Sequence, residues 1–214
     1  MKPAERKNTR SKQQVVSQFR RAEILDAARK VFARKGFALG IMDEIAREAG
    51  IAKGTIYLYF RSKTEVYQAL LAHDMKVLQA STLERIDAQP TLSGKIRAFI
   101  LTRIENADQQ KEIFRIMDSE RVNLTITRRQ YRDFLHVPVQ RLAEAIDAEA
   151  ARGAARRLEA ERVAWLIADM TRGTIQRRLL GQSELAPAAE AEFLMNVLTP
   201  ALGLGPERRA SRRR

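Results

Sequence analysis

The chain has 214 residues, of which 39 are Lys or Arg and 26 are Asp or Glu, so its formal net charge is +13 at pH 7. It contains no cysteine, which excludes a disulfide scaffold, a cysteine-ligated metal and a thiol nucleophile. No apolar run approaches the roughly 20 residues of a membrane span, and the basic N-terminus has no apolar segment behind it, so we expect a cytoplasmic protein without a secretory signal.

The positive charge is concentrated towards the two ends of the chain. Residues 1–63 carry a net charge of +9, residues 64–205 are electrically balanced, and residues 206–214 carry +4. A positive field confined to one small unit favours a polyanionic partner such as nucleic acid. Runs of charge also serve only to solvate a surface, so charge alone leaves both interpretations open.

In chain order, residues 1–18 are polar, basic and aperiodic, which is typical of a disordered arm. From Phe19 onward the apolar residues recur with helical spacing, and Gly36 ends this first helix. A second helix of about two turns is expected over residues 42–49, and a third over residues 53–60.

The sequence Ser62-Lys63-Thr64-Glu65 matches a capping box, in which the Ser62 hydroxyl accepts from the Glu65 amide. It predicts a fourth helix that starts near Lys63 and extends towards Leu83. Further helices are expected over residues 92–107, 110–122, 127–151, 158–181 and 187–202. Because no segment alternates with period two, we expect an all-α protein, followed by a disordered basic tail over residues 205–214.

The second and third helices are joined by a turn of about four residues, which is the spacing of a helix-turn-helix. In that motif the first helix braces against the DNA backbone and the second enters the major groove. On the third helix Ile56 and Phe60 are expected to face the core. The groups left outside are a cation, a hydroxyl and two phenols, which bond phosphate oxygens and base edges: Lys53, Thr55, Tyr57 and Tyr59. Half-buried aromatics without a DNA role are the alternative for the tyrosines.

Residues 21–71 resemble the DNA-binding domain of the TetR family of bacterial transcriptional regulators. The matching run is ILDAARKVFARKGFALGIMDEIAREAGIAKGTIYLYFRSKTEVYQALL, in which several separated elements agree in order and spacing. The resemblance covers about a quarter of the chain. It implies an N-terminal three-helix helix-turn-helix DNA-binding domain over residues 19–64, joined to a C-terminal helical ligand-binding and dimerisation domain over residues 65–204.

The resemblance implies six DNA-binding positions: Lys53, Gly54, Thr55, Tyr57, Tyr59 and Lys63. Tyr57 occupies a phosphate-contacting position and Tyr59 a position that faces DNA. The amide and ammonium of Lys63 can meet a phosphate at the start of the fourth helix. The chain departs from the family pattern at Gly40-Ile41, where Thr-Thr or Thr-Ser is common, and at Ala52, where Ser is frequent. Two hydroxyls are therefore missing.

In this family the ligand pocket lies inside the regulatory helices. The resemblance therefore makes polar and aromatic residues of the central helices candidate ligand-binding residues: Arg103, Phe114, Met117, Tyr131, Phe134, His136, Trp165, Met170 and Arg177. The alternatives are a place in the core for the apolar ones and a solvated or paired position for the polar ones. The two histidines, His73 and His136, lack partners at metal-ligand spacing, so we expect no metal and no cofactor.

Two broad apolar bands, over residues 163–174 and 193–202, resemble the helices through which this family dimerises. An intrachain core is the alternative for these bands. A symmetric homodimer would place two recognition helices about one helical turn of DNA apart, roughly 34–36 Å.

The sequence therefore predicts a sequence-specific DNA-binding transcriptional regulator, namely a homodimeric repressor that a small-molecule effector releases from a palindromic operator. Its expected partners are double-stranded DNA, a second copy of the chain and the effector, with no membrane. A non-specific architectural DNA-binding protein and a TetR-like activator are the alternatives. An enzyme is not expected, because the chain has no evident nucleophile–base pair, metal set or Gly-rich phosphate loop.

Overall fold

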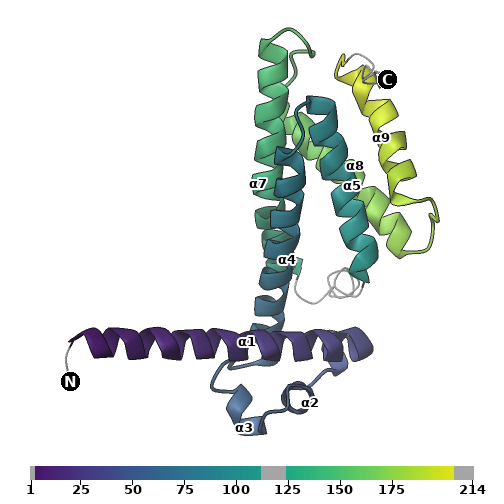
Figure 1. Ribbon diagram of the computed structural model, residues 1–214. Coiled ribbons are helices and arrows are strands. Elements are labelled where there is room, and N and C mark those ends of the chain that lie inside the picture. The colour runs from purple at the N-terminus through teal and green to yellow at the C-terminus, as the bar shows by residue number, and fades with distance from the viewer. Residues whose placement is uncertain (1–2, 112–123, 205–214) are drawn as a thin grey trace, which may run out of the picture. The chain divides into compact units, whose positions relative to one another are not determined.

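The computed structural model describes residues 3–111 and 124–204, with side chains from residue 15 to 111 and from 132 to 204. Within these ranges every regular element is an α-helix, which confirms the predicted all-α class (Figure 1). The helices are α1 (Pro3–Leu39), α2 (Met42–Glu48), α3 (Lys53–Ile56), α4 (Lys63–Asp87), α5 (Leu92–Gln109), α7 (Leu124–Ala151), α8 (Ala160–Leu179) and α9 (Pro187–Ala201). Most of the helix predicted over residues 110–122 lies outside the described residues.

Helix α1 begins at Pro3, which differs from the expected disordered arm over residues 1–18. Its first turns are rich in Arg, Lys and Gln, which have high helix propensity. Extending an existing helix also costs less free energy than starting a new one. At the other end Gly36 leaves the helical conformation with φ 72° and ψ 169°, as the sequence predicts.

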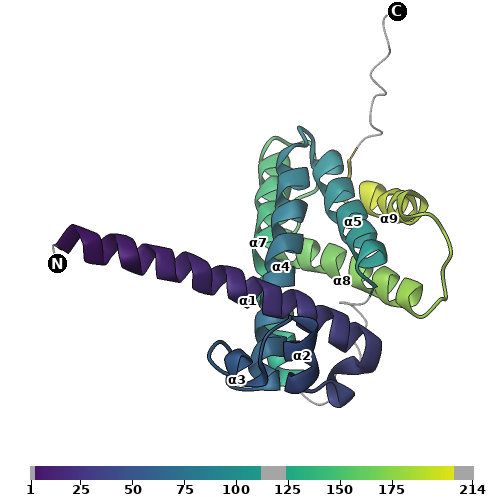
Figure 2. The ribbon, with the colours of Figure 1, turned by 60° about the horizontal axis from the view of Figure 1, so that its bottom comes forward.

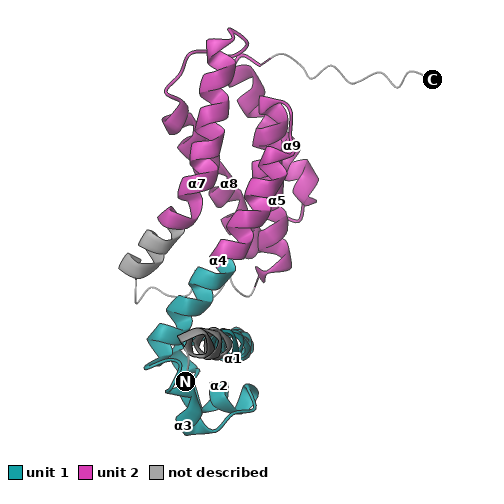
Figure 3. Cartoon of the chain, turned by 60° about the vertical axis from the view of Figure 1, so that its left-hand side comes forward, with its two compact units in different colours: residues 1–74, 115–124 teal, residues 75–114, 125–214 magenta. Residues whose placement is uncertain are grey.

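The chain forms two compact units, which Figure 3 shows in different colours. We call the first the head (Met1–Asp74 with Arg115–Leu124) and the second the body (Met75–Phe114 with Thr125–Arg214). The boundary falls within α4, between Asp74 and Met75, whereas the expected domain boundary lay at residues 64 and 65.

The head is built around one apolar cluster, in which α2 packs against α1 and α3 against α2 (Figures 1 and 2). Its fully buried members include Ala28, Ile45, Ile56, Phe60 and Val66. Gly40 permits this packing, because a Cβ at that position would lie 2.9 Å from the Phe32 ring. The departure from the family pattern at Gly40 therefore has a steric reason.

In the body, α5 packs against both α8 and α9. The second half of α4 lies beside α7, where Arg141 pairs with Asp87 at 2.6 Å. Pro138 lies inside α7 and has no N–H to donate to the Phe134 carbonyl one turn earlier. The Gln79 amide of α4 donates to that carbonyl at 2.7 Å, so a neighbouring helix supplies a donor that the proline lacks. No helix in the described part of the chain is long and apolar enough to cross a membrane.

Candidate nucleic-acid interface

Helix α2 is anchored by three buried residues, Met42, Ile45 and Ala46. Its N-cap is Ile41, which has extended backbone angles and forms no side-chain cap hydrogen bond. The start of α2 therefore lacks the hydroxyl cap that the family pattern commonly supplies. Asp43 and Glu44 in the first turn place negative charge near the positive end of the helix dipole, which favours the helix.

Helix α3 is one turn long, so the helix predicted over residues 53–60 was too long. The amides of Leu58 and Tyr59 donate to the carbonyls of Thr55 (3.1 Å) and Ile56 (3.0 Å), which tightens the chain into turns after the helix. Ile56 and Phe60 are fully buried, as their spacing predicts, and hold both ends of this segment against the head.

The predicted DNA-binding residues differ in exposure. Lys53, Gly54 and Tyr57 are exposed, and the Tyr57 side chain is 45% accessible. Thr55 and Tyr59 are half-buried, and Tyr59 packs against the apolar cluster of the head. The outward surface of α3 is therefore formed by Lys53, Gly54 and Tyr57. Thr55 and Tyr59 lie at the edge of this surface.

Sequence reasoning missed Leu58, whose side chain is 81% exposed in the turn that follows α3. A leucine so exposed on a small unit has no packing role there. Its position between two tyrosines, out of register with Ile56 and Phe60, was the available signal. An exposed apolar group of this kind can contact the methyl group of thymine in a major groove.

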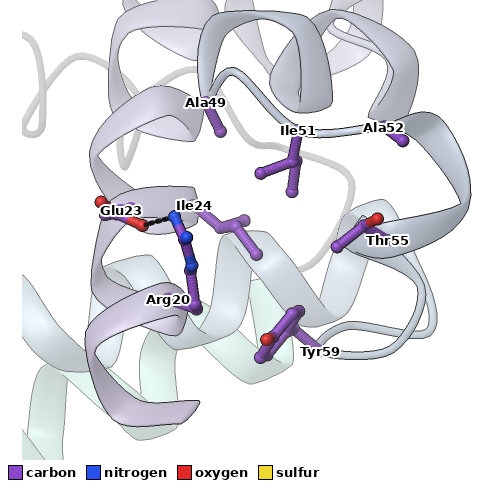
Figure 4. Close-up of a pocket in the computed structure, with 8 residues that line it drawn as sticks. All are labelled: Arg20, Glu23, Ile24, Ala49, Ile51, Ala52, Thr55 and Tyr59. Carbon is purple, nitrogen blue, oxygen red and sulfur yellow. Dashed lines mark hydrogen bonds and ion pairs between the residues drawn. The ribbon is translucent and has the colours of Figure 1, made fainter. Parts of the chain in front are cut away.

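Thr55 and Tyr59 border a hollow of about 170 Å³ between α1 and the α2–α3 region (Figure 4). Ile24 and Ile51 line it, and so does Arg20 of α1, which pairs with Glu23 at 2.7 Å. Thr55 and Tyr59 are half-buried at the edge of this hollow, beside the exposed surface of α3.

Lys53 is exposed, but its ammonium group donates to the Asp43 carboxylate of α2 at 2.7 Å. This hydrogen bond, with the charge of Asp43, raises the pKa of Lys53. The lysine is thus fully cationic at neutral pH and is held at the α2–α3 junction. A phosphate that binds Lys53 must compete with Asp43.

The predicted capping box at the start of α4 is formed in part as expected. The Ser62 hydroxyl accepts from the Glu65 amide at 3.2 Å, and Glu65 reaches back to the Arg61 amide at 2.7 Å. Lys63 lies at the first position of α4, but its ammonium donates to the carbonyls of Phe37 (2.7 Å) and Ala38 (3.0 Å) near the end of α1. In this structure the ammonium expected to meet a phosphate is therefore bound to protein carbonyls.

The candidate ligand-binding residues are spread over several helices of the body. Phe114 and Met117, and the side chain of Tyr131, lie outside the described residues. Arg103 of α5 is buried and donates to the Ala168 carbonyl of α8 at 3.2 Å, so it joins two helices. The rest divide by exposure: Phe134 is buried, Trp165 and Met170 are half-buried, and His136 and Arg177 are exposed.

Over the residues that the structure describes, no group of three or more His, Cys, Asp or Glu side chains is arranged to hold a metal ion.

Comparison with known proteins gives a match to the head. The family model described as "Bacterial regulatory proteins, tetR family" matches residues 24–70. The uncharacterized HTH-type transcriptional regulator YfiR of Bacillus subtilis (strain 168) is 46% identical over 52 residues, which are 24% of this chain and 25% of YfiR. The chain therefore spans about a quarter of the length of these relatives.

Comparison of folds extends over both units. The transcriptional regulator FadR from Bacillus subtilis, solved in complex with stearoyl-CoA, matches with a TM-score of 0.72 at 20% identity, over 86% of this chain and 99% of FadR. AibR, solved in complex with isovaleryl coenzyme A and operator DNA, matches with a TM-score of 0.65 at 19% identity, over 85% of this chain and 98% of AibR. At these identities the likeness establishes a shared fold.

Proposed function

Because the chain carries the N-terminal domain of the tetR family of bacterial regulatory proteins, we propose that it is a sequence-specific transcriptional regulator. It binds a palindromic operator as a homodimer, represses transcription, and is released when a small-molecule effector binds in the body. A ligand of this kind acts through its different affinities for the DNA-binding and released states.

The observation that carries the proposal is the outward surface of α3 and the turn after it. Lys53, Tyr57 and Leu58 are exposed there, while Ile56 and Phe60 anchor the same short segment in the core. A cation, a phenol and an apolar group on a rigid support are suited to phosphates, base edges and thymine methyl groups. Thr55 contributes a hydroxyl beside this surface, and Gly54 allows the backbone to come close to the duplex.

The proposed dimer forms through α8 and α9, which expose large apolar side chains. Leu166, Phe193 and Val197 are 56%, 60% and 50% accessible. Ala164 and Ala168 of the same bands are fully buried, which supports an intrachain role for that part. In sedimentation experiments Leu166→Asp together with Phe193→Asp should convert a dimer to a monomer. Val137→Asp, at an exposed position of α7, is the matched control and should leave the dimer intact.

Two solved structures of similar fold suggest which compounds to test as the effector. FadR and AibR were each solved with an acyl-CoA thioester, so stearoyl-CoA and isovaleryl-CoA are the first compounds to test for release from DNA. Coenzyme A alone serves as a control. Release by the thioesters but not by coenzyme A would assign the effector class, and failure of both would exclude these two compounds.

The function is tested by selecting duplexes from a random-sequence pool with the full-length protein and footprinting the recovered sequence. The proposal expects a single protected palindrome, because a symmetric dimer reads two equivalent half-sites. Uniform coverage of every duplex would favour the architectural alternative. Transcription in vitro from a promoter carrying the selected site then separates the repressor, which lowers the transcript level, from an activator, which raises it.

A further inference from the structure

Most of the cationic side chains described in the head already have an acidic partner. Lys53 pairs with Asp43 at 2.7 Å and Arg34 with Glu48 at 2.8 Å. The other ion pairs are Lys30–Glu48, Lys35–Glu44, Arg20–Glu23, Arg29–Asp26 and Arg29–Asp74. Each pair cancels positive charge within the head, so the net charge of this segment overstates what it offers to a polyanion.

Two further cations are used by the protein backbone and by aromatic rings. Lys63 donates to two carbonyls and lies 4.5 Å from the centre of the Phe37 ring. Arg21 donates to the Tyr59 carbonyl, and its guanidinium lies 4.1 Å from the centre of the Phe60 ring. These contacts fix the end of α1 and the segment after α3, so neither cation is available for DNA without loosening the head.

Arg47 and Arg61 differ from all of these. Among the described residues neither guanidinium forms a hydrogen bond or an ion pair, and both residues are exposed. Arg47 acts on Glu44 through its charge alone. The pKa of Glu44 is lowered chiefly because Lys35 donates a hydrogen bond to it, and the charge of Arg47 adds a smaller contribution. Within the described part of the chain both arginines are therefore exposed and unpaired.

The two arginines flank α3 along the chain, Arg47 before it and Arg61 after it. Arg47 lies one helical turn after Asp43 on α2, and residues four apart share a helix face. Asp43 contacts Lys53 at the start of α3, so Arg47 lies on the α2 face that adjoins the start of α3. Arg61 follows the buried Phe60 in the segment between α3 and α4, and the bond from its own amide to Glu65 fixes its backbone.

We propose that Arg47 and Arg61 bind two DNA backbone phosphates that flank the bases contacted by α3. This assignment rests on the proposed DNA-binding function and adds two residues that the sequence motif does not supply. A paired cation must lose a protein carboxylate before it gains a phosphate. Arg47 and Arg61 gain the phosphate outright, and their planar guanidinium groups suit bidentate contact with its oxygens.

The test measures the dissociation constant of the full-length protein for the selected duplex between about 50 and 200 mM salt. Because a dimer carries two copies of each arginine, Arg47→Gln and Arg61→Gln should each reduce the slope of log affinity against log salt by about 1.8, which corresponds to a loss of roughly sixtyfold at 0.1 M. The loss should be the same on an unselected random-sequence duplex, because phosphate contacts do not read the sequence.

Arg34→Gln is the matched control, since it removes the same charge from an arginine that is paired with Glu48 and 58% exposed. It should change the slope by less than half as much as the other two variants. Circular dichroism and thermal unfolding establish that all three variants are folded, so a lost slope can be attributed to the missing guanidinium.

The outcomes separate the two proposals. If the wild-type protein binds and both Arg47→Gln and Arg61→Gln keep its slope, the phosphate assignment is wrong and the proposed function stands. If Arg34→Gln loses as much slope as they do, a diffuse field acts in place of two sites, and the assignment is again wrong. If the wild-type protein enriches no duplex at all, the proposed function itself fails.

Discussion

The head and the body place their polar side chains differently. In the head, most carboxylates pair with cations on exposed helix faces, as Asp43 does with Lys53, and Asp74, which pairs with Arg29, is a buried exception. In the body, polar side chains lie within helix interfaces, where Arg103, Thr171 and Glu190 are no more than 5% exposed. Changes to these exposed charges of the head should therefore alter binding with little effect on folding, whereas changes to the buried polar groups of the body should alter folding first.

The apolar cores provide the baseline for this comparison, because they should respond alike. Phe60 in the head and Phe99 in the body are both fully buried, and replacing either by Ala should lower the free energy of unfolding by about 3–5 kcal/mol. Urea denaturation measures this loss. Phe60→Ala should also lose DNA binding, since it frees the segment after α3. Normal DNA binding by a folded Phe60→Ala protein would contradict the anchoring role.

The Asp108–Arg178 pair of the body tests the cost of removing a partly buried charge. Arg178 is 10% exposed, and its Nε donates to Asp108 at 3.1 Å across α5 and α8. Asp108→Asn should lower the free energy of unfolding by about 1.5–3 kcal/mol, because it weakens charge-assisted hydrogen bonds. Asp87→Asn removes the same charge from a pair with both partners 44% exposed and should cost about 0–1 kcal/mol. Equal costs would remove the distinction between buried and exposed pairs.

The amide of Gln79 tests the support that α4 gives to the proline-containing helix α7. Gln79→Leu removes the donor to the Phe134 carbonyl and should lower the free energy of unfolding by about 1–3 kcal/mol. Gln140→Leu makes the same substitution at an exposed site of α7 and is the control for the change in polarity. If both variants unfold at the wild-type urea concentration, the carbonyl does not depend on Gln79.

In the head, Asp43→Asn should raise DNA affinity while leaving stability close to that of the wild type. The change releases Lys53 from its partner, so that its full charge is available to a phosphate. We expect a gain of about two- to eightfold for each half-site at 0.1 M salt, with a steeper salt dependence. Asp26→Asn, which removes an equal charge from α1, should give a smaller gain. A loss of affinity in Asp43→Asn would mean that Asp43 is needed to orient Lys53.

The smallest expected effect is the loss of stability of the head at low pH. Hydrogen bonds from Lys35 and Arg34 lower the pKa values of Glu44 and Glu48, respectively, below 4.5. A lowered pKa means that the carboxylates stabilise the head above that pH, and that this contribution is lost as the pH falls through their folded values. The urea midpoint should therefore decrease slightly on acidification below about pH 4.5, and the Glu44→Gln, Glu48→Gln double variant should decrease less. A midpoint that rises in acid would reverse the sign.

The head could be predicted in detail because the relevant residues are close in sequence. The spacing of Ile56 and Phe60 predicted their burial, and Ser62 with Glu65 predicted the start of α4. The destination of the Lys63 ammonium could not be predicted, because its carbonyl partners lie 25 and 26 residues away. The length of α3 also depends on hydrogen bonds that periodicity does not encode.

In the body the helices were predictable and their polar contacts were not. Arg103 meets the Ala168 carbonyl 65 residues away, and Arg178 meets Asp108 at a separation of 70. Helical periodicity specifies which face of each helix is apolar, but it carries no information on which two faces meet. Candidate ligand-binding residues chosen by type alone were therefore spread over buried and exposed positions, from Arg103 to His136.

The position of the Lys63 ammonium has a consequence for the chemistry of the surface. An amine held by two carbonyl oxygens and the Phe37 ring reacts slowly with an acylating reagent, because those contacts must be lost before the nitrogen can attack. Lys30, which is 64% exposed, is open to the same reagent. Mass-spectrometric labelling rates would thus report the integrity of the junction between α1 and α4 in the absence of any DNA.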